Sequence, residues 1–125
     1  MRTTVDGIVA VGGHSYGGRQ ASILSTEQPG LIDALLLMGY PLHPPRKPAQ
    51  LRTAHFPDWR CPALFLHGTR DPFASIEELT TATAAIPAPV RILPQEKAGH
   101  ELKGLQPTVA VSEFENLLGL SARSG

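Results

Sequence analysis

The sequence contains little cysteine and no excess charge of either sign. Cys61 is the only cysteine among 125 residues, and 11 basic side chains balance 11 acidic ones. One thiol excludes an internal disulfide and a multi-cysteine zinc site, and it fits a reducing compartment. We therefore expect a cytoplasmic protein in which Cys61 is a small buried side chain. A formal net charge of zero provides no basic field for nucleic acid or for an anionic membrane surface.

Long hydrophobic runs and cofactor motifs are also missing. The apolar run Ile8-Val9-Ala10-Val11 is too short for a signal peptide or a membrane span. No metal site is predicted, because no H-x-x-x-H pair and no cluster with carboxylates occurs among the five histidines, which are His14, His43, His55, His67 and His100. The glycines form neither a P-loop nor G-x-G-x-x-G, so we predict no cofactor. With 125 residues and 42% hydrophobic content, the chain suits one domain spanning residues 1–125.

The most informative segment that is present reads Gly13-His14-Ser15-Tyr16-Gly17-Gly18. It matches G-x-S-x-G, the strand-to-helix turn that exposes the nucleophile of a serine hydrolase. We expect glycines two residues on either side of the serine because the turn is too sharp for flanking side chains. Ile8 to Val11 before it is typical of a strand, and Arg19 to Leu24 after it is typical of a helix.

The rest of the chain alternates between apolar runs and helical segments. The box Ser75-Ile76-Glu77-Glu78 predicts the start of a helix that runs to about Ile86, and a last helix is expected from Pro107 to Gly119. Buried parallel strands are predicted by three further apolar runs, which are Leu31 to Met38, Pro62 to His67 and Val90 to Leu93. The pattern predicts an α/β fold with a parallel sheet.

Three polar residues follow separate strands of this predicted sheet. Ser15, Asp71 and His100 occur in the chain order nucleophile, acid, base, and functional loops of parallel sheets lie at the carboxyl ends of strands. Ser15 would attack an acyl carbon, His100 would take and return the proton, and Asp71 would orient the imidazole. Two alternatives remain at this stage: Asp71 is only a turn residue, and His100 is only a surface histidine. His14 is expected to pack against the turn, and His67 to steady the Asp71 loop.

These motifs together resemble the α/β-hydrolase superfamily near its dienelactone-hydrolase-like members. The segments that carry the resemblance are Gly13 to Arg19, Leu66 to Phe73 and Ala98 to His100. Gly39 to Pro45 looks particularly like a subgroup containing a testis-expressed protein and a subunit of a chromatin acetyltransferase complex. The resemblance implies a serine hydrolase acting on a small-molecule ester or similar acyl substrate.

The resemblance covers only the C-terminal half of the family's fold. The family's sheet has eight strands and the nucleophile follows the fifth, so here the fold is expected to be truncated to about four strands with flanking helices. The Ile8 to Val11 strand would then have an unpaired edge that favours self-association. The backbone N–H of Tyr16 would supply one oxyanion donor, whereas the second comes, in the family, from a loop after the third strand. Loss of one donor costs on the order of 3 kcal/mol, a hundredfold or more in rate.

Three hypotheses follow from the sequence. The chain is a serine hydrolase with a Ser-Asp-His triad, or a non-catalytic interaction module that keeps the triad as architecture, or part of a longer reading frame. The connection from Gly39 to Arg60 holds five prolines. It forms either one wall of a substrate pocket or an ordered surface excursion stiffened by its prolines.

Overall fold

In the described residues, the fold is built around one five-stranded sheet with two α-helices and one short 3-10 helix. The computed structural model describes residues 2–5, 8–47, 49–102 and 116. The strands lie in the order β1-β2-β3-β4-β5, and β2 to β5 run parallel to one another. This confirms the predicted parallel α/β sheet. The elements are β1 (Arg2–Val5), β2 (Ile8–His14), α1 (Tyr16–Glu27), β3 (Ala34–Met38), η1 (Phe56–Asp58), β4 (Ala63–Gly68), α2 (Ile76–Thr83) and β5 (Val90–Gln95).

Strand β1 was not predicted, and it changes the edge of the sheet. It pairs antiparallel with β2, with Arg2 opposite Val11 and Val5 opposite Ile8. The prediction that the Ile8 to Val11 strand has an unpaired edge is therefore wrong, because the backbone groups on that side of β2 face β1. The outer strand on this side is β1, and self-association through the sheet edge stays a prediction.

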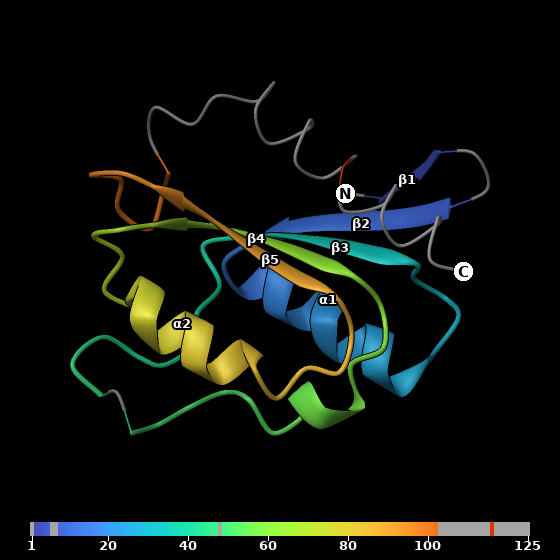
Figure 1. Ribbon diagram of the computed structural model, residues 1–125, viewed down its shortest axis with the longest axis horizontal. Coiled ribbons are helices and arrows are strands. Elements are labelled where there is room, and N and C mark those ends of the chain that lie inside the picture. The colour runs from blue at the N-terminus through green and yellow to red at the C-terminus, as the bar shows by residue number, and fades with distance from the viewer. Residues whose placement is uncertain (1, 6–7, 48, 103–115, 117–125) are drawn as a thin grey trace.

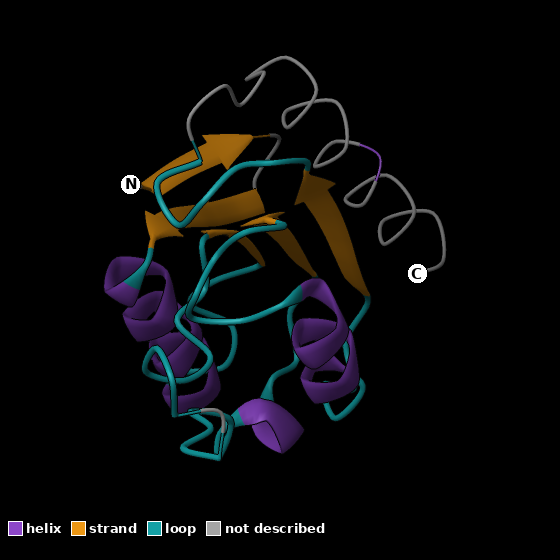
Figure 2. Cartoon of the chain, turned by 90° about the vertical axis from the view of Figure 1, so that its left-hand side faces the viewer, coloured by secondary structure: helices purple, strands orange, loops and turns teal. Residues whose placement is uncertain are grey.

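The main core lies between the sheet and the two helices. Figures 1 and 2 show α1 and α2 on the same face of the sheet, with the connection between β3 and β4 running beneath them. Leu35, Leu37 and Phe65 point to this face and are completely buried. The opposite face buries Leu64 and Leu66 in a smaller cluster. Because β3 and β4 place apolar side chains on both faces, their sequences are continuous hydrophobic runs, as expected for strands at the centre of a parallel sheet.

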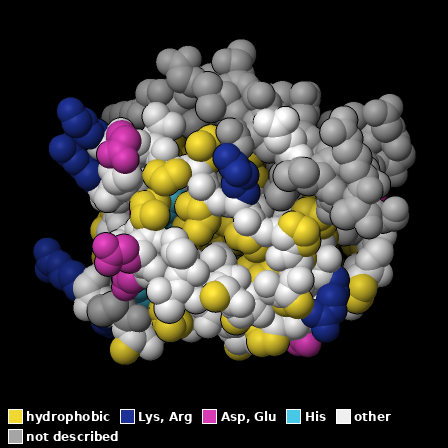
Figure 3. All heavy atoms as spheres, in the orientation of Figure 1, with side chains coloured by type: hydrophobic (Ala, Val, Ile, Leu, Met, Phe, Trp, Pro, Cys, Tyr) yellow, Lys and Arg dark blue, Asp and Glu magenta, His cyan; other side chains and the backbone are white. Residues whose placement is uncertain are grey.

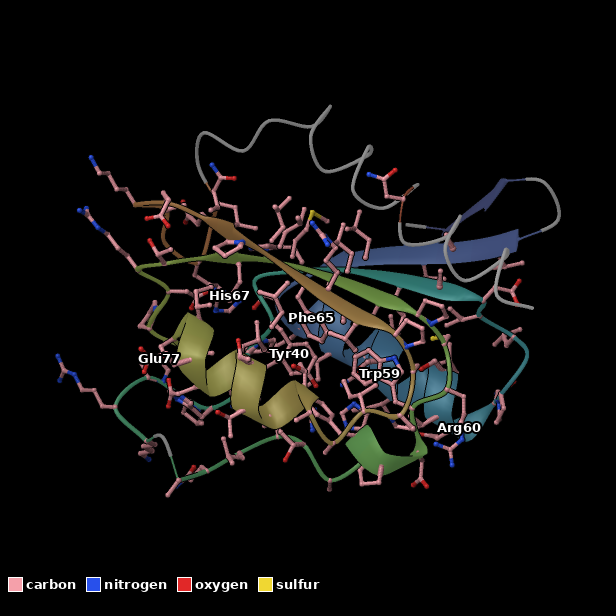
Figure 4. All side chains as sticks on the ribbon, in the orientation of Figure 1. Tyr40, Trp59, Arg60, Phe65, His67 and Glu77 are labelled. Atoms are coloured by element: carbon pink, nitrogen blue, oxygen red, sulfur yellow. The ribbon has the colours of Figure 1, made fainter. Side chains whose placement is uncertain are left out.

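The connection from residue 39 to residue 62 is anchored by aromatic side chains. Tyr40, Phe56 and Trp59 are each at most 1% exposed, and they form edge-to-face or tilted ring pairs with one another or with Phe65 of β4. Figure 4 shows Tyr40, Phe65 and Trp59 gathered between the sheet and the helices. Cys61 at the end of the connection is buried, as expected. This part of the chain is a component of the core as well as a surface excursion.

Helix α2 begins where the sequence predicts and ends earlier. The Ser75 side chain accepts a hydrogen bond from the Glu78 N–H, and the Glu78 carboxylate accepts one from the Ser75 N–H, so the predicted capping box is confirmed. The helix ends at Thr83 and not near Ile86, because the N–H of Ile86 bonds to the Thr83 carbonyl in a tighter turn before Pro87.

Two further features bear on the sequence predictions. The last predicted helix, from Pro107 to Gly119, lies outside the described residues except for Asn116. No helix in the described part of the chain is long and apolar enough to cross a membrane.

In the face shown by Figure 3, hydrophobic side chains occupy the middle, and charged side chains of both signs are scattered around them.

Candidate active site

Ser15 occupies a sharp turn between the end of β2 and the start of α1. Its φ of 56° and ψ of −126° are unusual for a residue with a side chain. Such a backbone costs about 1–3 kcal/mol and persists only where the surrounding structure enforces it. Here the Ser15 N–H donates to the Met38 carbonyl of β3 at 2.8 Å, and α1 starts at the next residue. The sequence therefore forms the predicted strand–turn–helix unit.

Two glycines allow α1 to approach β2 closely. A Cβ on Gly13 would lie 2.6 Å from the Gly18 nitrogen, and a Cβ on Gly18 would lie 2.8 Å from the Gly13 carbonyl oxygen. The prediction for Gly13 is confirmed, but that for Gly17 is wrong, since a Cβ there meets nothing within 4 Å. The close contact is at Gly18, because the helix turns its third residue, and not its second, back onto the strand.

The loops that follow β4 and β5 are joined by backbone hydrogen bonds. The Thr69 N–H donates to the Gln95 carbonyl at 3.0 Å, and the Arg70 N–H donates to the Ala98 carbonyl at 2.9 Å. A Cβ on Gly68 would collide with the carbonyl oxygen of Ala98. Gly68 lets the two loops approach closely. The hydrogen bonds between the loops fix the position of Asp71 in the first loop and of His100 in the second.

The three side chains predicted from the sequence meet at this edge of the sheet. The His100 Nε2 lies 2.6 Å from the Ser15 Oγ, and the His100 Nδ1 lies 2.7 Å from the Asp71 Oδ2. An ionised carboxylate can only accept, so Nδ1–H donates to Asp71 and Nε2 accepts the Ser15 hydroxyl proton. The Asp71 side chain is fully buried, whereas the His100 side chain is 18% exposed. The arrangement places a proton acceptor on a serine hydroxyl that is near the surface.

Asp71 has further partners that hold its carboxylate. Its Oδ1 accepts the Phe73 N–H at 2.8 Å, so the turn role considered from the sequence coexists with the contact to His100. His67, which is completely buried, donates from Nε2 to the Ala74 carbonyl at 2.8 Å, and the same nitrogen lies 3.6 Å from the Asp71 Oδ2. Burial lowers the pKa of His67, which favours the neutral ring. His67 thus steadies the Asp71 loop, as expected.

His14 supports the histidine from the other side. Its Nε2 lies 2.7 Å from the His100 carbonyl oxygen and donates to it, and the two rings are 5.2 Å apart. The sequence predicts a packing role for His14, and the structure gives it a hydrogen bond to the backbone of the residue that faces Ser15.

Tyr16, whose N–H is predicted from the sequence to be an oxyanion donor, lies at the start of α1. Tyr16 is the first residue of the helix, so its N–H has no intrahelical acceptor and follows directly after the nucleophile. The second donor is expected from a loop that precedes the strand of the nucleophile. In the described residues only β1 precedes β2, so that loop is not among them.

Two residues beside the nucleophile were missed by the sequence analysis. Arg52 donates from Nη1 to the Tyr16 hydroxyl at 3.0 Å, and Phe73 packs against the His100 ring at a centroid distance of 4.2 Å. Arg52 belongs to no motif, and Phe73 ends the segment Leu66 to Phe73, in which the sequence pattern indicates no role for its ring. Among the described residues, no group of three or more His, Cys, Asp or Glu side chains could hold a metal ion.

A parallel sheet that presents a serine on a strained turn between strand and helix is the architecture of the α/β-hydrolase class. Residues 1–117 match the family model described as an alpha/beta hydrolase domain. The chain belongs to this family.

Solved structures with the same fold have low sequence identity to the chain. Dienelactone hydrolase from Anabaena variabilis is 23% identical, with a TM-score of 0.64 over 85% of this chain and 46% of that one. The esterase domain of a Rhodothermus marinus protein is 20% identical, with a TM-score of 0.63 over 91% and 59%. Monoacylglycerol lipase from Paleococcus ferrophilus is 13% identical, with a TM-score of 0.70 over 88% and 68%. The chain therefore spans about half the length of the dienelactone hydrolase.

Proposed function

We propose that the chain is a serine hydrolase that cleaves esters through Ser15, His100 and Asp71. The observation that carries this proposal is the continuous chain of hydrogen bonds from the Ser15 hydroxyl through the His100 ring to the buried Asp71 carboxylate. The match to an alpha/beta hydrolase family supports it, and so do similar structures whose names include esterase and lipase.

In the first half of the reaction, the Ser15 Oγ attacks the carbonyl carbon of the ester while its proton passes to the His100 Nε2. The Asp71 carboxylate holds the ring with Nε2 toward the serine and stabilises the imidazolium that forms. The negative charge on the carbonyl oxygen is met by the Tyr16 N–H. When the tetrahedral species collapses, His100 returns the proton to the alcohol, which leaves, and an ester between Ser15 and the acyl group remains.

In the second half, water replaces the alcohol. His100 accepts a proton from the water as the oxygen attacks the acyl carbon. When the second tetrahedral species collapses, the bond between the Ser15 Oγ and the acyl carbon breaks, the carboxylic acid leaves, and His100 returns the proton to Ser15. With the Tyr16 N–H as the sole donor, transition states would lack about 3 kcal/mol of stabilisation, so we expect turnover a hundredfold or more below that of a site with two donors.

The proposal is tested by covalent labelling with a fluorophosphonate probe together with hydrolysis of p-nitrophenyl acetate. We expect the wild type to be labelled and to turn over the ester, and we expect both signals to be lost in Ser15→Ala. His100→Ala should lose at least a thousandfold in turnover, because a triad acts as a unit. Ser75→Ala, which removes a serine on α2 outside the site, is the matched control and should be labelled normally.

Labelling of the wild type no stronger than that of Ser15→Ala would contradict the proposal. That result would favour the second hypothesis from the sequence, a non-catalytic interaction module. In that case, the resemblance to the subgroup with a chromatin-complex subunit would be more relevant to function than the resemblance to hydrolases.

A further inference from the structure

The guanidinium of Arg52 lies on the flank of the nucleophile. Its Nη1 donates to the Tyr16 hydroxyl at 3.0 Å and to the Pro41 carbonyl at 3.4 Å, and its Cζ lies 4.9 Å from the centre of the Tyr16 ring. Tyr16 directly follows Ser15, so the Cα atoms of the two residues are about 3.8 Å apart. The contacts hold a cationic group, contributed by the connection between β3 and β4, against the residue next to Ser15.

The charge of Arg52 is not neutralised by a carboxylate of the described residues. Within the described part of the chain, Arg52 forms an ion pair with no carboxylate. The carboxylates near the site are already committed, because Asp71 binds His100 and Glu78 binds His43 at 3.0 Å. Arg52 is partly exposed, and its contacts to Tyr16 and Pro41 use one nitrogen. Among the described residues, the hydrogen bonds of the Arg52 side chain all come from Nη1, so Nε and Nη2 form the planar fork that would meet a carboxylate.

Two aromatic rings line the path between the reacting atoms and Arg52. Phe73 packs on the His100 ring, and Tyr16 meets Phe73 edge to face at a centroid distance of 6.3 Å. Tyr16 is 49% exposed, and Phe73 is partly exposed. The surface beside Ser15 therefore begins at the histidine, continues over apolar ring faces, and ends at a positive charge.

We propose that the site takes esters that carry a carboxylate, with Arg52 as the residue that recognises it. The ester carbonyl lies at Ser15, a short apolar chain crosses the Tyr16 and Phe73 rings, and the carboxylate accepts hydrogen bonds from the free side of the guanidinium. This inference rests on the proposed hydrolase function and adds the chemical class of the substrate. Charge-assisted hydrogen bonds of this kind are among the strongest in proteins.

The test compares a charged and a neutral ester of the same length in the wild type and in Arg52→Gln. One pair has the charge in the acyl group, mono-p-nitrophenyl glutarate against p-nitrophenyl pentanoate. A second pair has it in the alcohol, 4-acetoxybenzoate against methyl 4-acetoxybenzoate. For at least one pair we expect the ratio of kcat/KM for the charged to the neutral ester to fall about 10- to 100-fold in Arg52→Gln.

Two further variants separate charge from geometry. Arg52→Lys keeps the charge but not the fork, so it should recover only part of the ratio. Arg60→Gln removes another arginine of the same connection, which contacts the Pro57 carbonyl and lies away from His67 in Figure 4. It should leave the ratio unchanged. If the wild type hydrolyses these esters and neither pair shows a ratio that depends on Arg52, the proposal is overturned.

Binding to an inactive protein distinguishes this proposal from the proposed function. Monomethyl glutarate is titrated into Ser15→Ala and into Ser15→Ala/Arg52→Gln, and the dissociation constants are measured by NMR. About 10-fold weaker binding in the double variant supports anion recognition even if the wild type hydrolyses no ester, in which case only the hydrolase proposal fails. Equal binding in the two proteins would sink the role of Arg52, whatever the activity of the wild type.

Discussion

Gly13 and Gly18 are the residues that allow Ser15 its position. Each would place a Cβ against the backbone of the other at less than 3 Å, whereas the glycine between Tyr16 and Gly18 has open space around it. The three glycines of the motif therefore serve different purposes. Gly13 and Gly18 are required by the close approach of α1 to β2. Position 17 has room for a side chain, so the fold does not require glycine there.

We predict opposite outcomes for two alanine substitutions in this motif. Gly13→Ala should cost about 2 kcal/mol or more in the free energy of unfolding, because its clash is with backbone that cannot move aside. Gly17→Ala should leave that free energy equal or raise it by up to about 1 kcal/mol, because alanine loses less backbone entropy on folding. Urea denaturation measures both. A Gly13→Ala protein as stable as Gly17→Ala would show that the turn relaxes and that the contact is not restrictive.

At the residue scale, the sequence identifies the site residues that belong to motifs. It does not identify residues that contact the site only because the folded chain packs them there. Ser15, Asp71 and His100 are predictable because each follows an apolar run at the carboxyl end of a strand. Arg52 is not, since it lies 36 residues from Tyr16 and meets it only through the path of the connection. The hydrogen bond of His14 to the His100 backbone spans 86 residues and is equally invisible in the sequence.

At the scale of elements, α2 is defined by its first turn. The side chains of Ser75 and Glu78 each accept a hydrogen bond from the backbone N–H of the other residue. The Glu78 carboxylate also binds His43, which lies in the connection between β3 and β4. The hydrogen bond to His43 and the backbone N–H of Ser75 lower the pKa of Glu78. Burial alone would lower the pKa of His43, but its hydrogen bonds to the Pro44 carbonyl and to Glu78 raise it overall. The cap therefore also ties the helix to the segment at residue 43.

We predict that Ser75→Ala destabilises the protein by about 1 kcal/mol, the usual cost of losing a serine N-cap. Urea denaturation followed by far-UV circular dichroism gives the value. Thr80→Ala, which removes a hydroxyl bonded within the same helix to Ile76, is the control and should change stability by less than about 0.5 kcal/mol. Equal losses in the two variants would argue against the cap as a determinant of α2.

The strand that the sequence analysis missed could have been found in the sequence. Thr3, Thr4 and Val5 are typical of strands, and Asp6-Gly7 is a dipeptide favoured between the strands of a hairpin. The segment is short and lies before the first apolar run, so its strand signal is weak. The parallel strands were predicted correctly because burial on both faces makes them hydrophobic throughout, which β1 as an edge strand does not need to be.

At the scale of the whole molecule, His55 joins the connection between β3 and β4 to α1. The Ser22 hydroxyl donates to the Arg19 carbonyl, so its oxygen accepts from the His55 Nε2 at 2.8 Å, and the imidazole stacks on Trp59 at a centroid distance of 5.8 Å. Burial lowers the pKa of His55 from its ordinary value of 6.5 to about 4, and the nearby Arg19 charge adds to this effect. The junction is therefore built for a neutral ring.

This depressed pKa predicts that the protein loses stability in mild acid. Between pH 6.5 and about 4 the unfolded chain binds a proton at His55 that the folded chain does not, so the free energy of unfolding falls as the pH falls through this range. Urea denaturation at pH 7, 5.5 and 4.5 should show a larger loss for the wild type than for His55→Gln, which keeps a donor but does not titrate. Other titrating groups contribute equally to both proteins. Parallel losses would exclude His55 as a source of the acid sensitivity.

The pairing of the loops after β4 and β5 has one more consequence. Within the described residues, the hydrogen bonds that join Ser15, Asp71 and His100 to one another and to their supports connect residues between His14 and His100, and none of them involves β1. Under the proposed function, activation of Ser15 and stabilisation of the oxyanion depend on different elements, because Asp71 and His100 follow β4 and β5 whereas the Tyr16 N–H lies at the start of α1. The loops after β4 and β5 then control the proton acceptor, and the start of α1 controls the oxyanion donor, so a change in one should leave the other in place.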